Sequence, residues 1–180
     1  MSGTDRTGTR EMIEQVALRL FAEQGFSHTS LQQIADEVGV TKAALYYYYP
    51  SKGELAQKLV APTKSDIDGL LDEAEHAEDV DSREVLGRFF DLLVQHAPVL
   101  AAMVRDGTIL GHVDFSAWTI EWLQRFQTIL VGQDATIERR ARAVVAAGGL
   151  ARALILIQDG SIEEVRSAAL DAACSALGVE

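Results

Sequence analysis

Residues 29–52 have the sequence TSLQQIADEVGVTKAALYYYYPSK, and this stretch decides the fold that the chain is predicted to adopt. Ser30 and Gln33 have the spacing of a capping box, so a helix should begin at Ser30. Apolar residues then recur every three or four positions, which gives the helix one buried face. Gly39 can take the left-handed conformation that ends a helix, and Thr41 can cap the next one. A connection of about three residues between two helices is typical of a helix-turn-helix.

The second helix of this pair, expected over 42–49, contains four consecutive tyrosines. Successive helical residues are about 100° apart, so four tyrosines span about 300° and cannot all face a core. Leu45 and Tyr49, four positions apart, form the inward pair. The outward residues are Tyr46, Tyr47 and Tyr48. Exposed phenol groups can stack on sugars and donate to phosphate oxygens, although they also suit a protein contact.

The first turn of this helix is the part of a helix-turn-helix that reaches base edges in DNA. It contains Thr41, Lys42, Ala43 and Ala44, and the two small alanines let the backbone come close to a partner. Pro50 then closes the helix. This turn is therefore the expected reading surface.

A third helix should open directly after Pro50, because Ser51 and Glu54 again have capping-box spacing. Lys52 lies in its first turn. Free backbone amides, the positive end of the helix dipole and an ammonium group would then converge on one point, which suits a phosphate.

These residues together resemble the DNA-binding signature of the TetR family of bacterial transcriptional regulators. The resemblance covers about Arg10 to Leu59 and rests on many separately placed positions. They are Gly25, Thr29, Ser30, Leu31, Ile34, Ala35, Gly39, Val40, Thr41, Lys42, Leu45, Tyr46, Tyr48, Tyr49, Pro50, Ser51, Lys52 and Leu55. Two departures are Tyr49, where the family often has Phe, and the length of the tyrosine run.

The resemblance implies an all-helical homodimer that represses transcription, binds a palindromic operator in double-stranded DNA and is released by a small, apolar effector. It places Gln32 and Lys42 at base-facing positions. The helix-turn-helix DNA-binding domain is expected at 9–56, and a helical ligand-binding and dimerisation domain at 57–180. The expected DNA-binding set is Ser30, Gln32, Thr41, Lys42, Ala43, Ala44, Tyr46, Tyr47, Tyr48 and Lys52.

Composition agrees with an all-α class. The 180 residues are 48% hydrophobic, and β-branched residues form no alternating runs. The net charge of −11 divides unevenly, because residues 1–60 carry six Lys/Arg and seven Asp/Glu and so contribute −1, which leaves −10 for the remainder. A single cysteine, Cys174, and a polar N-terminus fit a cytoplasmic protein without disulfides, and Cys174 is expected to be a small buried residue.

Several boundaries follow from helix signals in the rest of the chain. A helix that begins near Ser51 should kink or stop at Pro62, which is either a joint that responds to ligand or a simple break. Asp106 and Gly107 should end a short helix that follows Pro98. The last two helices are expected at 135–158 and 162–177.

A cluster of aromatic, Met and His residues is the expected ligand site, because such side chains line apolar pockets. The same side chains fill helical cores, so that alternative remains open for each member. The expected set is Phe90, Met103, His112, Phe115, Trp118, Trp122 and Phe126.

Small residues in the last two helices predict a close helix contact, because two mid-helix glycines are costly unless something offsets them. The resemblance implies that this pair meets its copy across a two-fold axis, and packing within one subunit is the alternative. The expected dimer interface is Val145, Gly148, Gly149, Arg152, Ile155, Ala169, Ala172 and Ala173.

The chain lacks the motifs of the common enzyme classes, including a P-loop, a dinucleotide fingerprint and a zinc-protease helix. We therefore expect no enzymatic activity, no metal site and no cofactor. The remaining alternative is a helical protein-interaction module that does not bind DNA.

Overall fold

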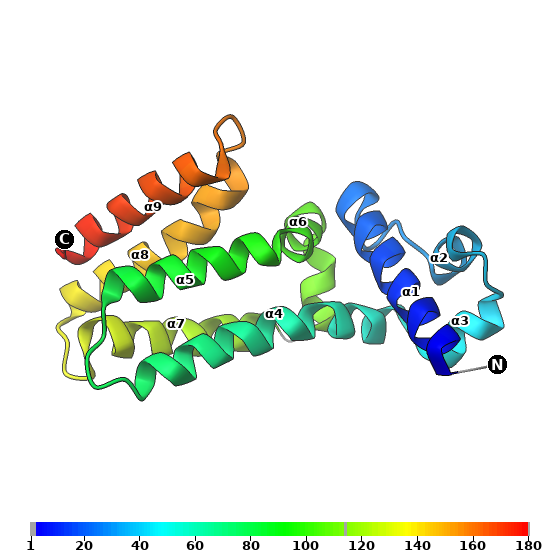
Figure 1. The fold of residues 1–180 in the computed structure, drawn as a ribbon, viewed down its shortest axis with the longest axis horizontal. Coiled ribbons are helices and arrows are strands. Elements are labelled where there is room, and N and C mark those ends of the chain that lie inside the picture. Colours follow the sequence, from blue (N-terminus) through cyan, green and yellow to red (C-terminus); the bar gives the residue numbers. More distant parts are fainter. Residues whose placement is uncertain (1–2, 114, 180) are drawn as a thin grey trace. The chain divides into compact units, whose positions relative to one another are not determined.

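The computed structural model describes residues 3–113 and 115–179, with side chains for all of these except 3–6, 115 and 116. Every regular element in these ranges is a helix, which confirms the all-α prediction (Figure 1). The elements are α1 (Gly3–Gln24), α2 (Leu31–Val38), α3 (Lys42–Tyr48), α4 (Lys52–Glu75), α5 (Ser82–Gln95), α6 (Ala97–Arg105), the 3-10 helix η1 (Gly107–His112), α7 (Phe115–Val131), α8 (Ile137–Leu156) and α9 (Ile162–Leu177).

The chain forms two compact units. The first contains residues 1–62 together with 97–115, and the second contains residues 63–96 together with 116–180. We expected two domains that are continuous in the sequence, with a boundary at 56/57. The first unit instead includes α6 and η1, which we had placed in the second domain.

The helix-turn-helix forms as its capping residues predict. Ser30 caps α2 through a complete capping box with Gln33. Gly39 ends the helix with φ of 78°, in the left-handed region. Thr41 Oγ1 then accepts a hydrogen bond from the amide of Ala44 at 3.1 Å and caps α3. Each of these signals is local, so the sequence specifies them directly.

The core of the first unit lies between α1 and the helices that surround it. Ile13, Ala17 and Phe21 of α1 are fully buried, and Leu45 of α3 meets the same core. Helix α1 packs against α2 on one side and against α6 on another. The helix-turn-helix is therefore one part of a larger unit that α6 completes.

Helix α4 continues through Pro62, so the expected stop at this residue is wrong. Proline removes one backbone hydrogen bond, but α4 buries apolar residues on both sides of it, including Val60 and Ile67. This burial offsets the lost bond. The boundary between the two compact units falls between Pro62 and Thr63, inside the helix.

The second unit has an aromatic centre. Phe89 of α5 lies 4.7 Å from Phe126 and 5.3 Å from Trp122, measured between ring centroids. Helices α8 and α9 pack along each other, and both contact α5. Cys174 of α9 is buried, as expected for a small apolar side chain.

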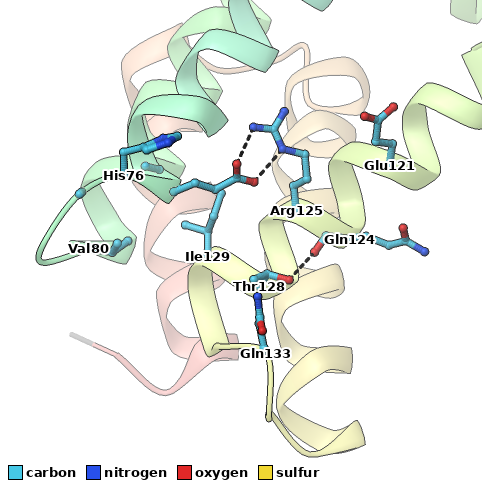
Figure 2. A pocket seen from close by; sticks show the side chains of 11 residues that line it. His76, Val80, Glu121, Gln124, Arg125, Thr128, Ile129 and Gln133 are labelled. Atoms are coloured by element: carbon cyan, nitrogen blue, oxygen red, sulfur yellow. Dashed lines mark hydrogen bonds and ion pairs between the residues drawn. The ribbon is translucent and has the colours of Figure 1, made fainter.

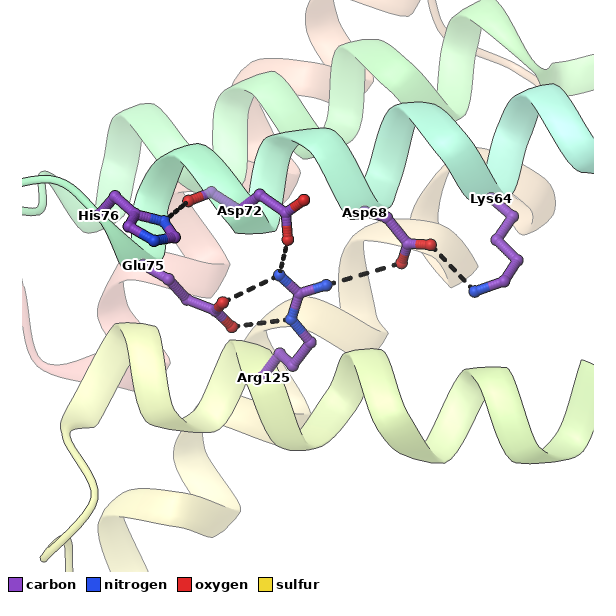
Figure 3. Close-up of polar contacts among 6 residues, drawn as sticks. All are labelled: Lys64, Asp68, Asp72, Glu75, His76 and Arg125. Carbon is purple, nitrogen blue, oxygen red and sulfur yellow. Dashed lines mark hydrogen bonds and ion pairs between the residues drawn. The ribbon is translucent and has the colours of Figure 1, made fainter.

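Arg125 of α7 fastens that helix to α4 within the second unit (Figure 3). Its guanidinium donates to both oxygens of Glu75 at 2.7 and 3.0 Å, and Nη2 also donates to Asp72. Asp68 lies at 3.7 Å. The side chain of Arg125 is only 19% exposed, and its hydrogen bonds to Glu75 raise its pKa. Three carboxylates of α4 therefore share one half-buried cation.

No single helix among the described residues is both long enough and apolar enough to cross a membrane. Helices α5 and α6 pass that test of length and composition only when they are taken together across their break.

We expect replacement of Arg125 by Ala to lower the free energy of unfolding by about 1–2 kcal/mol, because three carboxylates would then repel each other without a cation between them. Urea denaturation at low and high salt measures this effect. Salt should reduce the difference in the free energy of unfolding between the wild type and the variant, because it screens the repulsion between the carboxylates. The exposed Arg139 of α8 provides the matched control. Equal midpoints for the Arg125→Ala and Arg139→Ala variants would contradict the prediction.

Candidate functional site

A surface hollow of about 500 Å³ lies where α2, α3 and the start of α4 meet. It brings together five of the residues expected to bind DNA. They are Ser30, Gln32, Lys42, Tyr46 and Lys52. Ser27 and Pro50, which the motif analysis did not assign to DNA binding, also line it.

The tyrosine run divides as the helical period predicts. Leu45 and Tyr49 are buried, and the Tyr49 hydroxyl donates to Glu14, where burial raises the pKa of the phenol. Tyr47 is 74% exposed and Tyr46 is 42% exposed. Tyr48 is half-buried, with its ring 5.6 Å from that of Tyr47. Two phenols thus face solvent beside the first turn of α3.

The first turn of α3 is open to solvent. Thr41, Lys42 and Ala43 are exposed, and Ala44 is half-buried. The Lys42 ammonium lies 5.8 Å from the centroid of the Tyr46 ring, in a cation–π arrangement. This turn presents one cation, one phenol and a backbone that small side chains leave accessible.

Gln32 of α2 is exposed and its amide nitrogen donates to Asp36 at 2.7 Å. This bond lies on the surface of the helix, where water competes with it. Gln32 therefore has a defined position next to Lys42 in the hollow and keeps its amide oxygen free to accept.

Lys52 is held more tightly than the sequence indicates. Its ammonium donates to the backbone carbonyls of Phe26 at 2.6 Å and Thr29 at 2.8 Å, and lies 4.2 Å from the centroid of the Phe26 ring. Burial lowers its pKa, and the charge of Asp106 acts in the opposite direction. Because an ammonium has three donors, one remains for an outside acceptor.

Asp106, which sequence reasoning assigned only to ending a helix, is joined to the turn that precedes α2. Its Oδ2 accepts from the amide and the hydroxyl of Ser27, both at 2.6 Å. Its Oδ1 accepts from the amide of Thr108 at 3.0 Å and from its hydroxyl at 2.7 Å. No local signal links Asp106 to Ser27, because they are 79 positions apart.

The expected ligand set is divided between the two units. Met103 belongs to the core of the first unit, and the exposed His112 has its ring 5.0 Å from that of Phe26. The side chain of Phe115 lies outside the described residues. The remaining four belong to the second unit and are buried. They are Phe90, Trp118, Trp122 and Phe126.

Trp122 lies between two other rings of this set. Its centroid is 5.4 Å from that of Phe126 and 6.3 Å from that of Trp118. Its indole nitrogen is buried and has no hydrogen-bond partner among the described residues, and the same is true of the hydroxyls of Thr63 and Thr119. Buried polar groups are normally paired, so these three unpaired groups of the second unit require an explanation.

A second hollow, of about 690 Å³, lies between the end of α4 and α7 in the second unit (Figure 2). Its lining combines polar side chains, including Glu75, Glu121, Gln124 and Arg125, with apolar ones such as Val80 and Ile129. The guanidinium of Arg125 points to the Glu75 carboxylate and is paired with it (Figure 3). None of the residues expected to bind a ligand belongs to this lining.

The expected dimer residues lie on α8 and α9 and differ in exposure. Val145 is 64% exposed, and Gly149, Arg152 and Ala172 are also exposed. Half-buried members are Gly148, Ile155 and Ala169. Ala173 is buried within the chain. A side-chain carbon built on Gly149 would meet no atom within 4 Å, so contacts inside the chain do not require this glycine.

Comparison with known proteins agrees with the motif. Residues 13–59 match the family model described as bacterial regulatory proteins, tetR family. The chain is 44% identical over 59 residues to the transcriptional regulator AcrR of Shigella flexneri, a match that covers 33% of this chain and 27% of AcrR. It is 34% identical over 93 residues to the regulator TtgR of Pseudomonas putida, which covers 49% of this chain and 44% of TtgR.

The matched segments thus span less than half the length of these curated relatives. The fold as a whole resembles that of a transcriptional regulator from Aquifex aeolicus, with a TM-score of 0.75 at 20% identity over 91% of this chain and 96% of that one. The named relatives are transcriptional regulators, in agreement with the expectation that the chain is not an enzyme. Residues 13–59 thus belong, by sequence, to the TetR family of bacterial regulatory proteins.

Proposed function

We propose that this protein is a transcriptional repressor that binds a palindromic DNA operator as a homodimer and is released by a small effector. The observation that carries the proposal is the exposed first turn of α3, with Lys42 and Tyr46 beside Gln32 in one hollow. A helix that enters the major groove reads bases from this end. Cationic and phenolic groups next to it can hold the phosphates on either side.

The residues in this surface divide by the chemistry that they offer. Gln32 and Lys42 carry amide and ammonium groups that can hydrogen-bond to base edges. Tyr46 and Tyr47 are exposed and can donate to phosphate oxygens. Lys52 has one donor left for a phosphate, and its main role is to hold the turn before α2. Loss of Lys52 would therefore act on the shape of the surface as well as on its charge.

The exposed stripe of α8 supports a dimer. Val145, Gly149, Arg152 and Leu156 recur at intervals of four, three and four residues, which places them on one face. Val145 and Leu156 are 64% and 75% exposed. A mid-helix glycine costs about 1 kcal/mol relative to alanine, and a second helix that approaches closely across a two-fold axis would offset that cost at Gly149.

The aromatic cluster of the second unit supports an effector site. Each unpaired buried polar group costs about 1–3 kcal/mol, so the orphan indole of Trp122 and hydroxyls of Thr63 and Thr119 favour a state in which something pairs with them. An indole nitrogen is a donor only. The effector proposed for this site is an apolar molecule that carries at least one hydrogen-bond acceptor.

Selection of duplexes from a random pool by the purified protein tests DNA binding. Affinity for a selected palindrome should fall by about a thousandfold or more between roughly 50 and 200 mM salt, because each phosphate contact releases counterions. The protein-interaction alternative predicts no selected duplex at any salt concentration. That result would end the proposal.

Replacement of Gln32 or Lys42 by Ala should change which bases are preferred, with a loss of about 1–3 kcal/mol at the base pair that each side chain contacts. Competition binding with a set of singly substituted operators measures the change. Lys58→Ala, which removes an exposed cation of α4, is the matched control and should leave the preference unaltered. An unchanged preference in all three variants would remove these two residues from the reading surface.

Replacement of Val145 by Asp should raise the dimer dissociation constant by about a hundredfold or more, because the new carboxylate would be buried without a partner. Sedimentation velocity over a concentration series measures this constant. Ile120→Asp, which places the same charge at an exposed apolar position of α7, should leave it unchanged. Equal constants for both variants would show that α8 does not form the interface.

A further inference from the structure

The turn of residues 25–29, between α1 and α2, is held by two opposite charges from different parts of the first unit. On one side, the Lys52 ammonium of α4 binds the carbonyls of Phe26 and Thr29. On the other, the Asp106 carboxylate, at the joint between α6 and η1, binds the amide and hydroxyl of Ser27. The turn leads directly into Ser30, the cap of α2. Its position therefore sets where α2 begins.

The two oxygens of Asp106 have separate partners. Oδ1 accepts both bonds from Thr108 and so caps η1, whereas Oδ2 accepts both bonds from Ser27. Hydrogen bonds from Ser27, and to a smaller extent from Thr108, hold the pKa of this carboxyl far below its usual range. The carboxyl therefore stays ionised at neutral pH. One carboxylate thus joins the 3-10 helix to the turn.

The turn has a shape that accommodates this carboxylate. Gly25 has φ of 94°, and a side-chain carbon at this position would lie 3.1 Å from Oδ2 of Asp106 and 3.2 Å from its Cβ. Only glycine combines this backbone conformation with the close approach. Gly25 is therefore required both for the end of α1 and for the contact with Asp106.

A second contact joins η1 to α4. The amide of Gln57 donates to the backbone oxygen of His112 at 2.9 Å, and the His112 ring lies against Phe26 of the same turn. The segment 97–113 is thus fixed to the helix-turn-helix at both ends of η1. Helix α6 adds its contact with α1 (Figure 1).

The connectivity of the chain gives these contacts a further consequence. Residues 97–115 belong to the first unit, but they follow α5 and precede α7, which both belong to the second. The segment is therefore continuous in backbone with α5 of the second unit, because His96 alone separates Gln95, the last residue of α5, from Ala97, the first of α6. Within residues 3–113 and 115–179, Asp106 is the only carboxylate that accepts hydrogen bonds from residues 25–29.

We propose that Asp106 is a positioning residue for DNA recognition: its Oδ2 couples the segment 97–113 to the turn that sets α2, so that effector and operator oppose each other through this contact. The inference rests on the proposed function and names its route of regulation. Coupling between two sites is reciprocal, so DNA bound at α3 must also change the stability of α6 and η1. This reciprocity allows a test without an identified effector.

Asp106→Asn breaks the link that the carboxylate makes between Ser27 and Thr108. Asn offers one acceptor oxygen where the carboxylate offers two, so it can accept from the backbone amide of Thr108 or from that of Ser27 but not from both. Glu11→Gln, at an exposed position of α1, removes the same charge without touching the turn and is the matched control.

Hydrogen exchange by mass spectrometry, on the full chain with and without a selected duplex, measures the coupling. In the wild type and in Glu11→Gln, DNA should slow exchange in both 29–52 and 97–113, the latter by about threefold or more. In Asp106→Asn, DNA should still slow exchange in 29–52. It should no longer slow exchange in 97–113, where the rates with and without DNA become about equal. A general loss of stability would speed exchange in both segments and would not change this ratio.

Full protection of 97–113 in Asp106→Asn, or no protection there in a wild type that binds DNA, would overturn the proposal. A wild type that binds no duplex gives no protection of 29–52, a result that refutes the proposed function instead. Should Asp106→Asn fail to fold, Ser27→Ala removes one of the two bonds to Oδ2 and should lower the protection of 97–113 by about half. Unchanged protection in that variant would likewise overturn the coupling.

Discussion

The hydrogen bonds from Lys52 to the carbonyls of Phe26 and Thr29 fix the turn on which the proposed DNA-binding surface depends. Helix α3 has seven residues, too few to persist alone in water, so its position comes entirely from its neighbours. Those neighbours meet at this turn, where α1 ends, α2 begins and α4 supplies the ammonium. The half-buried Lys52 ammonium satisfies two backbone carbonyls at once and so ties α4 to this turn.

The sequence could predict those features of the fold that depend only on residues close together in the chain. The capping box at Ser30 and the left-handed Gly39 occur where expected, because each is decided within a few positions. The inward and outward tyrosines also follow from the helical period alone. The expected stop at Pro62 did not occur, because burial of apolar residues along α4 outweighs one lost hydrogen bond.

The candidate sites show the same division. Lys42 and Gln32 could be placed from the motif, since exposure on a short helix needs no tertiary information. The contact between Ser27 and Asp106 could not, because it joins positions 79 apart and has no periodic signal. The aromatic, Met and His side chains could not be assigned from the sequence, since such side chains serve cores and pockets equally: Met103 lies in the core of the first unit, while Trp122 lies in the aromatic cluster of the second.

The insertion of residues 97–115 into the first unit also constrains how the protein is made. Synthesis proceeds from the N-terminus, and domains that are continuous in sequence can fold as they emerge. Here the helix-turn-helix emerges long before α6, so the face of α1 that α6 covers stays open until α4, α5 and α6 have been translated. Nascent chains of this regulator therefore expose apolar surface for longer than the position of the motif at the N-terminus suggests.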